Sequence, residues 1–138
     1  MAEEKELQEK LLAYRIIESR LDNFMRQRDA LMNRIVEIET TLTSLKEIGK
    51  EDTIFSLGSG IHAFGKTENK DKIIVEIGAG IALEKTAKEA EEILNKRKDE
   101  MEKALAELQK GIMQLSVGLK NLAPEIQDLI NKSRKKVG

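Results

Sequence analysis

One stretch of this sequence has residue types at a spacing that could hold a nucleotide. The order of Gly60, Gly65, Lys66 and Thr67 fits the phosphate-binding loop G-x-x-x-x-G-K-T. That loop functions between a strand and a helix, because the N–H groups of the loop and of the helix N-terminus bind the phosphates together. Here residues 61–64 alternate like a strand, and polar turn residues follow Thr67 where the helix should begin. We therefore predict a chance match, and a small nucleotide-binding protein stays only as an alternative.

The remaining side chains offer little other chemistry. His62 is the only histidine and cysteine is absent, so a histidine cluster for a metal ion or a catalytic triad is not expected. The 24 basic and 25 acidic residues nearly cancel, and no apolar run approaches the length of a membrane span. We predict a soluble cytoplasmic protein that is not an enzyme, has no cofactor or metal, and binds neither nucleic acid nor membrane.

Two long segments, residues 21–45 and 94–129, carry apolar residues at steps of three and four. This heptad repeat is typical of a coiled coil, in which one narrow stripe of each helix faces a partner helix. A composition with 36% charged and 3% aromatic residues also suits long helices better than a compact core. Only Arg28 and Lys98 are polar within the two stripes. The stripes form the seam, which consists of Leu21, Phe24, Arg28, Leu31, Ile35, Ile38, Leu42 and Leu45 and of Leu94, Lys98, Met101, Leu105, Leu108, Ile112, Leu115, Leu119, Leu122, Ile126 and Leu129.

The seam is less regular toward both ends of the chain. Apolar residues within 7–21 change phase, which should overwind or loosen the first helix there. In the second helix, Gly111 and Gly118 lie one heptad apart, and Pro124 is expected to interrupt the end. Either these features loosen the part of the coiled coil remote from its bend, or the coiled coil tolerates them, and the sequence leaves both readings open.

Between the two helices, residues 52–85 change to β periodicity and contain a duplication. Residues 54–61 match residues 74–81 at an offset of twenty residues, and each copy is a β run, a Gly-small-Gly turn and a second β run. Glycine supplies the positive φ values of a tight turn, so two β-hairpins are predicted. Thr86 and Glu89 should then cap the following helix as a capping box. The turn glycines are Gly58, Gly60, Gly78 and Gly80.

Four short strands cannot cover their own apolar side chains. An isolated hairpin is marginally stable in water, and its strand edges invite pairing with another chain. Either the apolar residues cover each other poorly or other subunits bury them. We favour the second reading and predict an oligomerisation module. The predicted assembly residues are Ile54, Leu57, Ile61, Phe64, Ile73, Val75, Ile77 and Ile81.

Near both ends of the chain, apolar residues extend beyond the seam as adjacent pairs. Neighbours on a helix point about 100° apart, so one member of each pair should face outward. In an antiparallel hairpin both ends meet at one tip, where an exposed apolar patch would bind another protein. A wider stripe that packs a neighbouring helix is an equally open reading. The pairs are Leu11 with Leu12, Ile16 with Ile17, and Leu129 with Ile130.

The predicted fold is mainly α, a long antiparallel two-helix coiled coil with two β-hairpins at its bend. Residues 1–138 are expected to form one domain, with helices over 4–48 and 86–132 and the hairpins within 52–85.

Residues 72–85 resemble the third and fourth strands of the α-class subunit of prefoldin, archaeal type, the chaperone also called the Gim complex. Residues 57–60 are similar to the family's first turn, and two hairpins rather than one favour the α class over the β class. The family usually has a Val-Pro pair before that turn, where this chain has Phe55-Ser56. The resemblance covers nearly the whole chain.

The resemblance implies a hexamer of two α and four β prefoldin subunits, in which the hairpins complete an oligomeric β-barrel. It implies an ATP-independent holdase that captures unfolded client proteins at the coiled-coil tips and delivers them to a group II chaperonin. A structural or filament-forming scaffold that binds no clients is the alternative. The client-binding residues implied at the tips are Leu7, Leu11, Leu12, Ile16, Ile126, Leu129 and Ile130.

Overall fold

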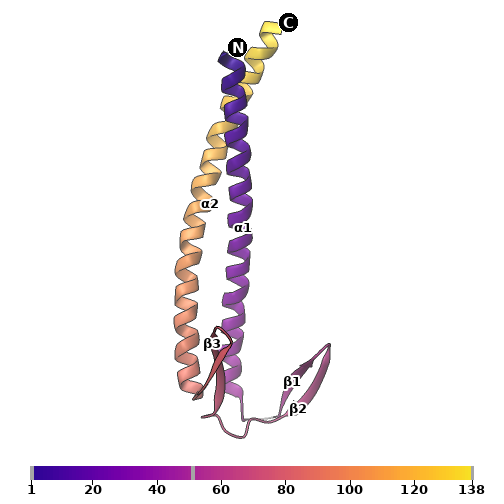
Figure 1. The fold of residues 1–138 in the computed structure, drawn as a ribbon, viewed down its shortest axis with the longest axis vertical. Helices are drawn as coiled ribbons and strands as arrows, with labels where there is room; N and C mark the ends of the chain where they lie inside the picture. Colours follow the sequence, from indigo (N-terminus) through magenta and orange to yellow (C-terminus); the bar gives the residue numbers. More distant parts are fainter. Residues whose placement is uncertain (1, 51, 138) are drawn as a thin grey trace. The chain divides into compact units, whose positions relative to one another are not determined.

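The structure, a computed structural model, describes residues 2–50 and 52–137 and is mainly α with two β-hairpins, as predicted (Figure 1). The chain forms two compact units. Met1–Met32 and Lys103–Gly138 make one, here called the terminal unit, and Asn33–Glu102 make the other, the hairpin unit. The elements in chain order are α1 (Ala2–Glu47), β1 (Thr53–Gly58), β2 (Ile61–Gly65), β3 (Ile73–Gly78), β4 (Ile81–Lys85) and α2 (Ala87–Val137).

In the terminal unit, α1 and α2 run antiparallel at a register fixed by three contacts. Lys10 Nζ lies 3.0 Å from Glu125 Oε2, and the next two contacts join Ile17 to Gly118 and Phe24 to Gly111. One heptad forward along α1 is therefore one heptad back along α2. Every seam position predicted from the sequence is buried or half-buried, so the heptad stripe does face the partner helix.

Gly111 provides space for an aromatic ring. A Cβ atom at Gly111 would lie 2.7 Å from Phe24 Cε2, which is too close for any residue other than glycine unless the ring moves. At Gly118 the same atom would lie 3.8 Å from Ile17 Cδ1, which is ordinary van der Waals contact. The first of the two glycines thus admits a large knob into the seam, and the second leaves room for a methyl group.

The prediction that Pro124 interrupts the second helix is wrong. Helix α2 continues through Pro124 to Val137, beyond the predicted end at residue 132. Proline removes only one i→i−4 hydrogen bond here. Ile126 and Leu129, just beyond it, are each 8% exposed, and burial of this kind stabilises a long helix more than single hydrogen bonds or propensities do.

In the hairpin unit, the helices end and begin with local hydrogen bonds. Gly49 follows α1 with φ of 80°, a left-handed conformation that favours glycine. The predicted capping box is confirmed before α2. The Glu89 N–H donates to Thr86 Oγ1 at 3.1 Å, and the Thr86 N–H donates to Glu89 Oε1 at 3.2 Å. Ile35, Ile38 and Ala90 are the buried apolar residues of this unit.

The two hairpins repeat each other position by position. Strands β1 and β2 pair antiparallel, as do β3 and β4, and each pair forms its own two-stranded sheet with a register shift just before the turn. At the turns Gly58, Gly60, Gly78 and Gly80 all have positive φ, as predicted for the turn glycines. Ser59 and Ala79, between the glycines, share φ of 52°. The duplication seen in the sequence is therefore a structural duplication.

Candidate protein-binding surfaces

Each hairpin has an inner and an outer face, defined by the alternation of side chains along the strands. In β2, Ala63 and Gly65 are half-buried while His62 and Phe64 are exposed, and in β3 the half-buried residues are likewise every second one. The inner faces comprise Thr53, Phe55, Ile61 and Ala63 in the first hairpin and Ile73, Val75, Ile81 and Leu83 in the second. The outer faces comprise Ile54, Ser56, His62 and Phe64 in the first hairpin and Ile74, Glu76, Ala82 and Glu84 in the second.

The inner face of the first hairpin is partly covered by its own side chains. The Phe55 ring lies over Gly65, where a Cβ atom would be 2.9 Å from Phe55 Cε2. Phe55 itself stays exposed, as do Leu57 and Ile61. With Phe55, Leu57 and Ile61 all exposed, most of the apolar surface of this sheet is open to a partner.

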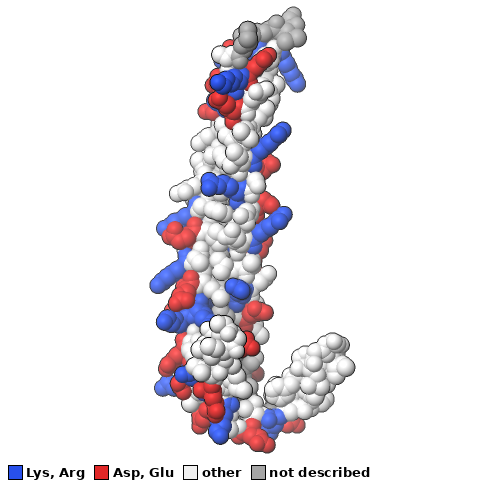
Figure 2. Space-filling model, viewed as in Figure 1, with Lys and Arg blue, Asp and Glu red and all other residues white. Residues whose placement is uncertain are grey.

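The outer faces of the two hairpins differ in charge. Phe64 and Ile54 are cross-strand partners in the first hairpin, and Phe64 is 82% exposed. The corresponding pair in the second hairpin is Glu84 with Ile74, and Glu76 adds a second carboxylate. In Figure 2 the visible face of the first hairpin, at lower right, carries none of the charged side chains that are spread over the helices.

A side chain of α2 holds the second hairpin. Arg97 Nη2 donates to the backbone carbonyl of Glu76 at 2.7 Å, so one outward-pointing carbonyl of β3 is satisfied by the helix.

The structure exposes most of the predicted assembly residues. Ile73 and Val75 are half-buried, and the other six are exposed. Sequence reasoning missed Phe55, Ile74 and Leu83, which are exposed as well. The twenty-residue duplication contained the signal for Ile74, because it occupies the position of Ile54 in the second copy.

The predicted client-binding residues divide into two groups. Leu12 is 60% and Ile16 is 51% exposed, whereas Ile126 and Leu129 are buried in the seam. Leu7, Leu11 and Ile130 are half-buried. The structure therefore presents only part of the predicted set as open surface. It also exposes five apolar residues of the helices that sequence reasoning missed, namely Met25, Met32, Val36, Met113 and Val117.

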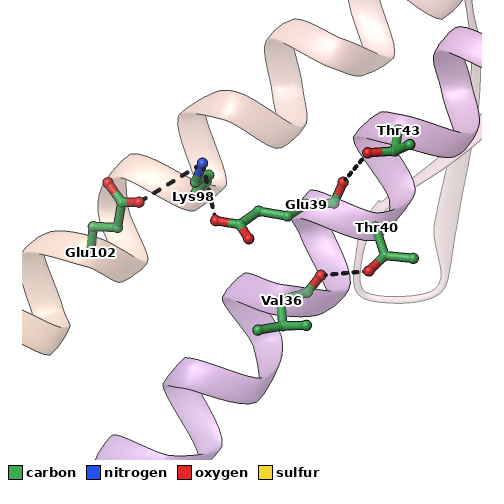
Figure 3. A network of polar contacts seen from close by, with 6 residues as sticks. All are labelled: Val36, Glu39, Thr40, Thr43, Lys98 and Glu102. Carbon is green, nitrogen blue, oxygen red and sulfur yellow. Dashed lines mark hydrogen bonds and ion pairs between the residues drawn. The ribbon is translucent and has the colours of Figure 1, made fainter.

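Both polar residues of the seam, Arg28 and Lys98, form ion pairs with nearby carboxylates. Lys98 Nζ lies 3.3 Å from Glu39 Oε1 across the seam and 4.0 Å from Glu102 Oε1 on its own helix (Figure 3). Arg28 pairs with the neighbouring Asp29. In the terminal unit, the hydrogen bond to Glu125 raises the pKa of Lys10, and the nearby Glu6 adds to the effect. These exposed pairs are worth little to stability and mainly favour one register.

Residues 60–67 do not form a phosphate-binding loop. Residues 61–65 are strand β2, and no helix begins at Lys66 or Thr67. Among residues 2–50 and 52–137, no group of three His, Cys, Asp or Glu side chains could hold a metal ion. None of the helices in the described part of the chain is long and apolar enough to span a membrane.

The family profile described as Prefoldin subunit matches residues 17–132. The chain belongs to the prefoldin family. It is 31% identical to the prefoldin subunit alpha of Methanosarcina barkeri over 105 residues, which cover 66% of this chain and 73% of that protein. It is also 31% identical to the prefoldin subunit alpha of Archaeoglobus fulgidus over 108 residues, 70% of this chain and 74% of that protein.

A solved structure supports the prefoldin fold. The chain in a cryo-EM structure of filamentous PFD from Methanocaldococcus jannaschii superposes with a TM-score of 0.51 at 22% identity, over 91% of this chain and 98% of that one. The resemblance to archaeal prefoldin α subunits is thus confirmed. The chain is a chaperone-family subunit rather than an enzyme, and it is built for an oligomeric prefoldin assembly.

Proposed function

We propose that this chain is the α subunit of an ATP-independent holdase, cytoplasmic and hexameric, with two α and four β subunits. The observation that carries the proposal is the contrast in exposure within one chain, where the seam is covered and the hairpins are not. An apolar sheet left open in the single chain is expected to be completed by the hairpins of other subunits. The inner faces, with Ile73 and Val75, would point into the resulting barrel.

Client capture would occur at the ends of the helices. Leu12 and Ile16 supply open apolar side chains on α1, with the half-buried Ile130 on α2, and an unfolded protein presents apolar segments of the same kind. Single contacts of this size are weak, but several arms in one complex would bind a client by avidity. Release to a group II chaperonin needs no chemistry in this chain, which accords with the strand conformation of residues 61–65.

The test is dilution refolding of an aggregation-prone protein without ATP. We would compare the chain alone, the chain with an archaeal β subunit, and the same complex carrying Leu12→Ser, Ile16→Ser and Ile130→Ser. The complex should suppress aggregation, and the triple variant should assemble and fail.

A matched control uses exposed apolar residues elsewhere on the helices. Val36 and Val117 are 58% and 51% exposed, close to the values of Leu12 and Ile16. Val36→Ser with Val117→Ser should keep full protection. If both sets of variants lose protection equally, clients bind along the helices and the proposed location is wrong.

A scaffold without clients is the second candidate, because the structural neighbour from Methanocaldococcus jannaschii is described as filamentous. Assembly of the complex with no protection in any sample would favour it over the holdase.

A further inference from the structure

Two hydrogen bonds attach the second hairpin to α2, both within the hairpin unit. At the base of the hairpin, just before β3 begins, the Ala87 N–H donates to the Lys70 carbonyl at 3.1 Å. Closer to the turn, Arg97 Nη2 donates to the Glu76 carbonyl at 2.7 Å. Helix α2 rises about 15 Å between residues 87 and 97, and residues 70–76 span at most about 20 Å of extended chain. Strand β3 therefore runs along the first turns of α2.

The bond from Arg97 is the one that sets the direction of the hairpin. A segment that is attached only at its base can pivot there, whereas a second attachment some distance away removes that freedom. A guanidinium donating to a carbonyl forms a charge-assisted hydrogen bond, which is stronger than a bond between neutral groups. Within residues 2–50 and 52–137, Arg97 forms no ion pair with a carboxylate, so its charge is directed at this carbonyl.

The first hairpin has no matching attachment at its middle. Ser56 occupies the position of Glu76 in the duplication, and no helix side chain in the described part of the chain donates a hydrogen bond to it. Burial differs in the same sense, because Val75 is half-buried while its counterpart Phe55 is 43% exposed. Two copies of one hairpin are thus held differently by the helices.

We propose that Arg97 is a positioning residue that makes the second hairpin and the first turns of α2 move as one body, while the first hairpin moves independently of α2. The inference goes beyond the proposed function, because it assigns to one side chain the direction in which α2 leaves the hairpins. An arm that captures clients would then be aimed by the second hairpin alone.

The experiment measures distances between pairs of spin labels in the free chain by pulsed electron paramagnetic resonance. The sequence has no cysteine, so labels attach only where cysteine is introduced. One pair is Glu84→Cys with Glu100→Cys, and the other is Phe64→Cys with Glu100→Cys. Residues 84 and 64 correspond in the duplication, and all three labelled positions are exposed. The first pair should give a narrow distance distribution and the second pair a broad one.

Arg97→Met keeps the length of the side chain and removes its donors. It should broaden the distribution of the 84–100 pair and leave that of the 64–100 pair unchanged. Arg97→Lys, which keeps the charge and can still donate, should restore part of the narrow distribution. The matched control is Lys96→Met, because Lys96 is the exposed neighbour of the half-buried Arg97, and this variant should leave both distributions unchanged.

Hydrogen exchange of the backbone amides gives a second readout without labels. Amides of β3 and β4 should exchange more slowly than those of β1 and β2 in the unsubstituted chain. Arg97→Met should speed exchange in β3 and β4 by about tenfold, with no change in β1 and β2.

A narrow 84–100 distribution in Arg97→Met would overturn the proposal, since other contacts would then hold the second hairpin. Equally narrow distributions for both pairs in the unsubstituted chain would overturn it too. Both measurements use the free chain, so neither outcome bears on the holdase. Absence of client protection by the assembled complex, with the distances as expected, would instead overturn the holdase alone.

Discussion

The seam and the hairpins both carry apolar residues at regular spacing, yet only the seam finds its partners within the chain. Along the seam, each helix offers the other a complementary stripe, and Ile38 and Leu129 are buried as a result. In each hairpin, two strands of five or six residues pair only with each other, and Phe64 and Ile74 stay open. The difference teaches that regular apolar spacing predicts a face, whereas the number of packed layers decides whether that face is covered in the free chain.

Removing an apolar side chain from the seam should have the largest effect on the free chain. Ile38→Ala should lower the free energy of unfolding by about 2–4 kcal/mol, because it deletes buried methyl groups and leaves a gap against α2. Urea unfolding followed by circular dichroism measures this. Val36→Ala, two positions away and 58% exposed, should change it by less than about 0.5 kcal/mol. Equal losses at both positions would show that the seam is not where the stability lies.

A charge on the inner face of a hairpin should weaken assembly with other subunits while leaving the stability of the free chain nearly unchanged. Val75→Glu should leave the urea midpoint of the free chain nearly unchanged, because Val75 is only half-buried in a two-stranded sheet. Its association with a β subunit should weaken by about a hundredfold or more, since the carboxylate would be buried without a partner. Titration by light scattering or calorimetry reports this. Intact assembly would show that the inner faces do not form the barrel.

The two seam glycines should respond to alanine with opposite signs. Gly111→Ala should destabilise the chain by about 1–2 kcal/mol, because the new methyl group would overlap the Phe24 ring. Gly118→Ala should stabilise it by about 0.5–1 kcal/mol, since alanine favours the helix and meets only ordinary contact there. Phe24→Leu combined with Gly111→Ala should recover part of the loss. Equal effects of the two alanines on the thermal midpoint would contradict the packing of Phe24.

The capping box before α2 should give the smallest effect, and one that depends on pH. Thr86→Ala should cost about 1 kcal/mol by removing one N-cap acceptor. Hydrogen bonds from Thr86 lower the pKa of Glu89 below its ordinary value, so Glu89 supports folding at pH values above about 4.5. That support is lost as pH falls through the lowered pKa. Glu89→Gln should be less stable at neutral pH and lose less on acidification. Parallel stability curves for the two proteins would rule out this role.

The heptad period alone predicted which helix residues are covered, because one stripe per helix is a property of each helix by itself. It could not pair Phe24 with Gly111, since that contact depends on the register between two segments far apart in the sequence. For the same reason, Ile126 and Leu129 were predicted both for the seam and for client binding, and only packing shows that the seam buries them.

In the hairpins, alternation and the duplication predicted strands and turns correctly. The contrast between the outer faces comes from the three positions at which Ser56, His62 and Phe64 correspond to Glu76, Ala82 and Glu84, and the strand register shows that these residues share one face. Helix α2 continues beyond its predicted end at residue 132, and the interruption predicted at Pro124 is absent because the buried Ile126 and Leu129 stabilise the helix there.

The contacts of Lys10 with Glu125, Ile17 with Gly118, and Phe24 with Gly111 repeat at one-heptad intervals in both helices. Arm length in this chain can therefore change only in matched steps. A heptad lost from one helix must be lost from the other at the facing position, or every knob beyond the deletion meets the wrong gap. Paired deletions of this kind would shorten both helices while leaving the hairpins unchanged. They would give a series of prefoldin-like complexes that differ only in the length of their coiled coils.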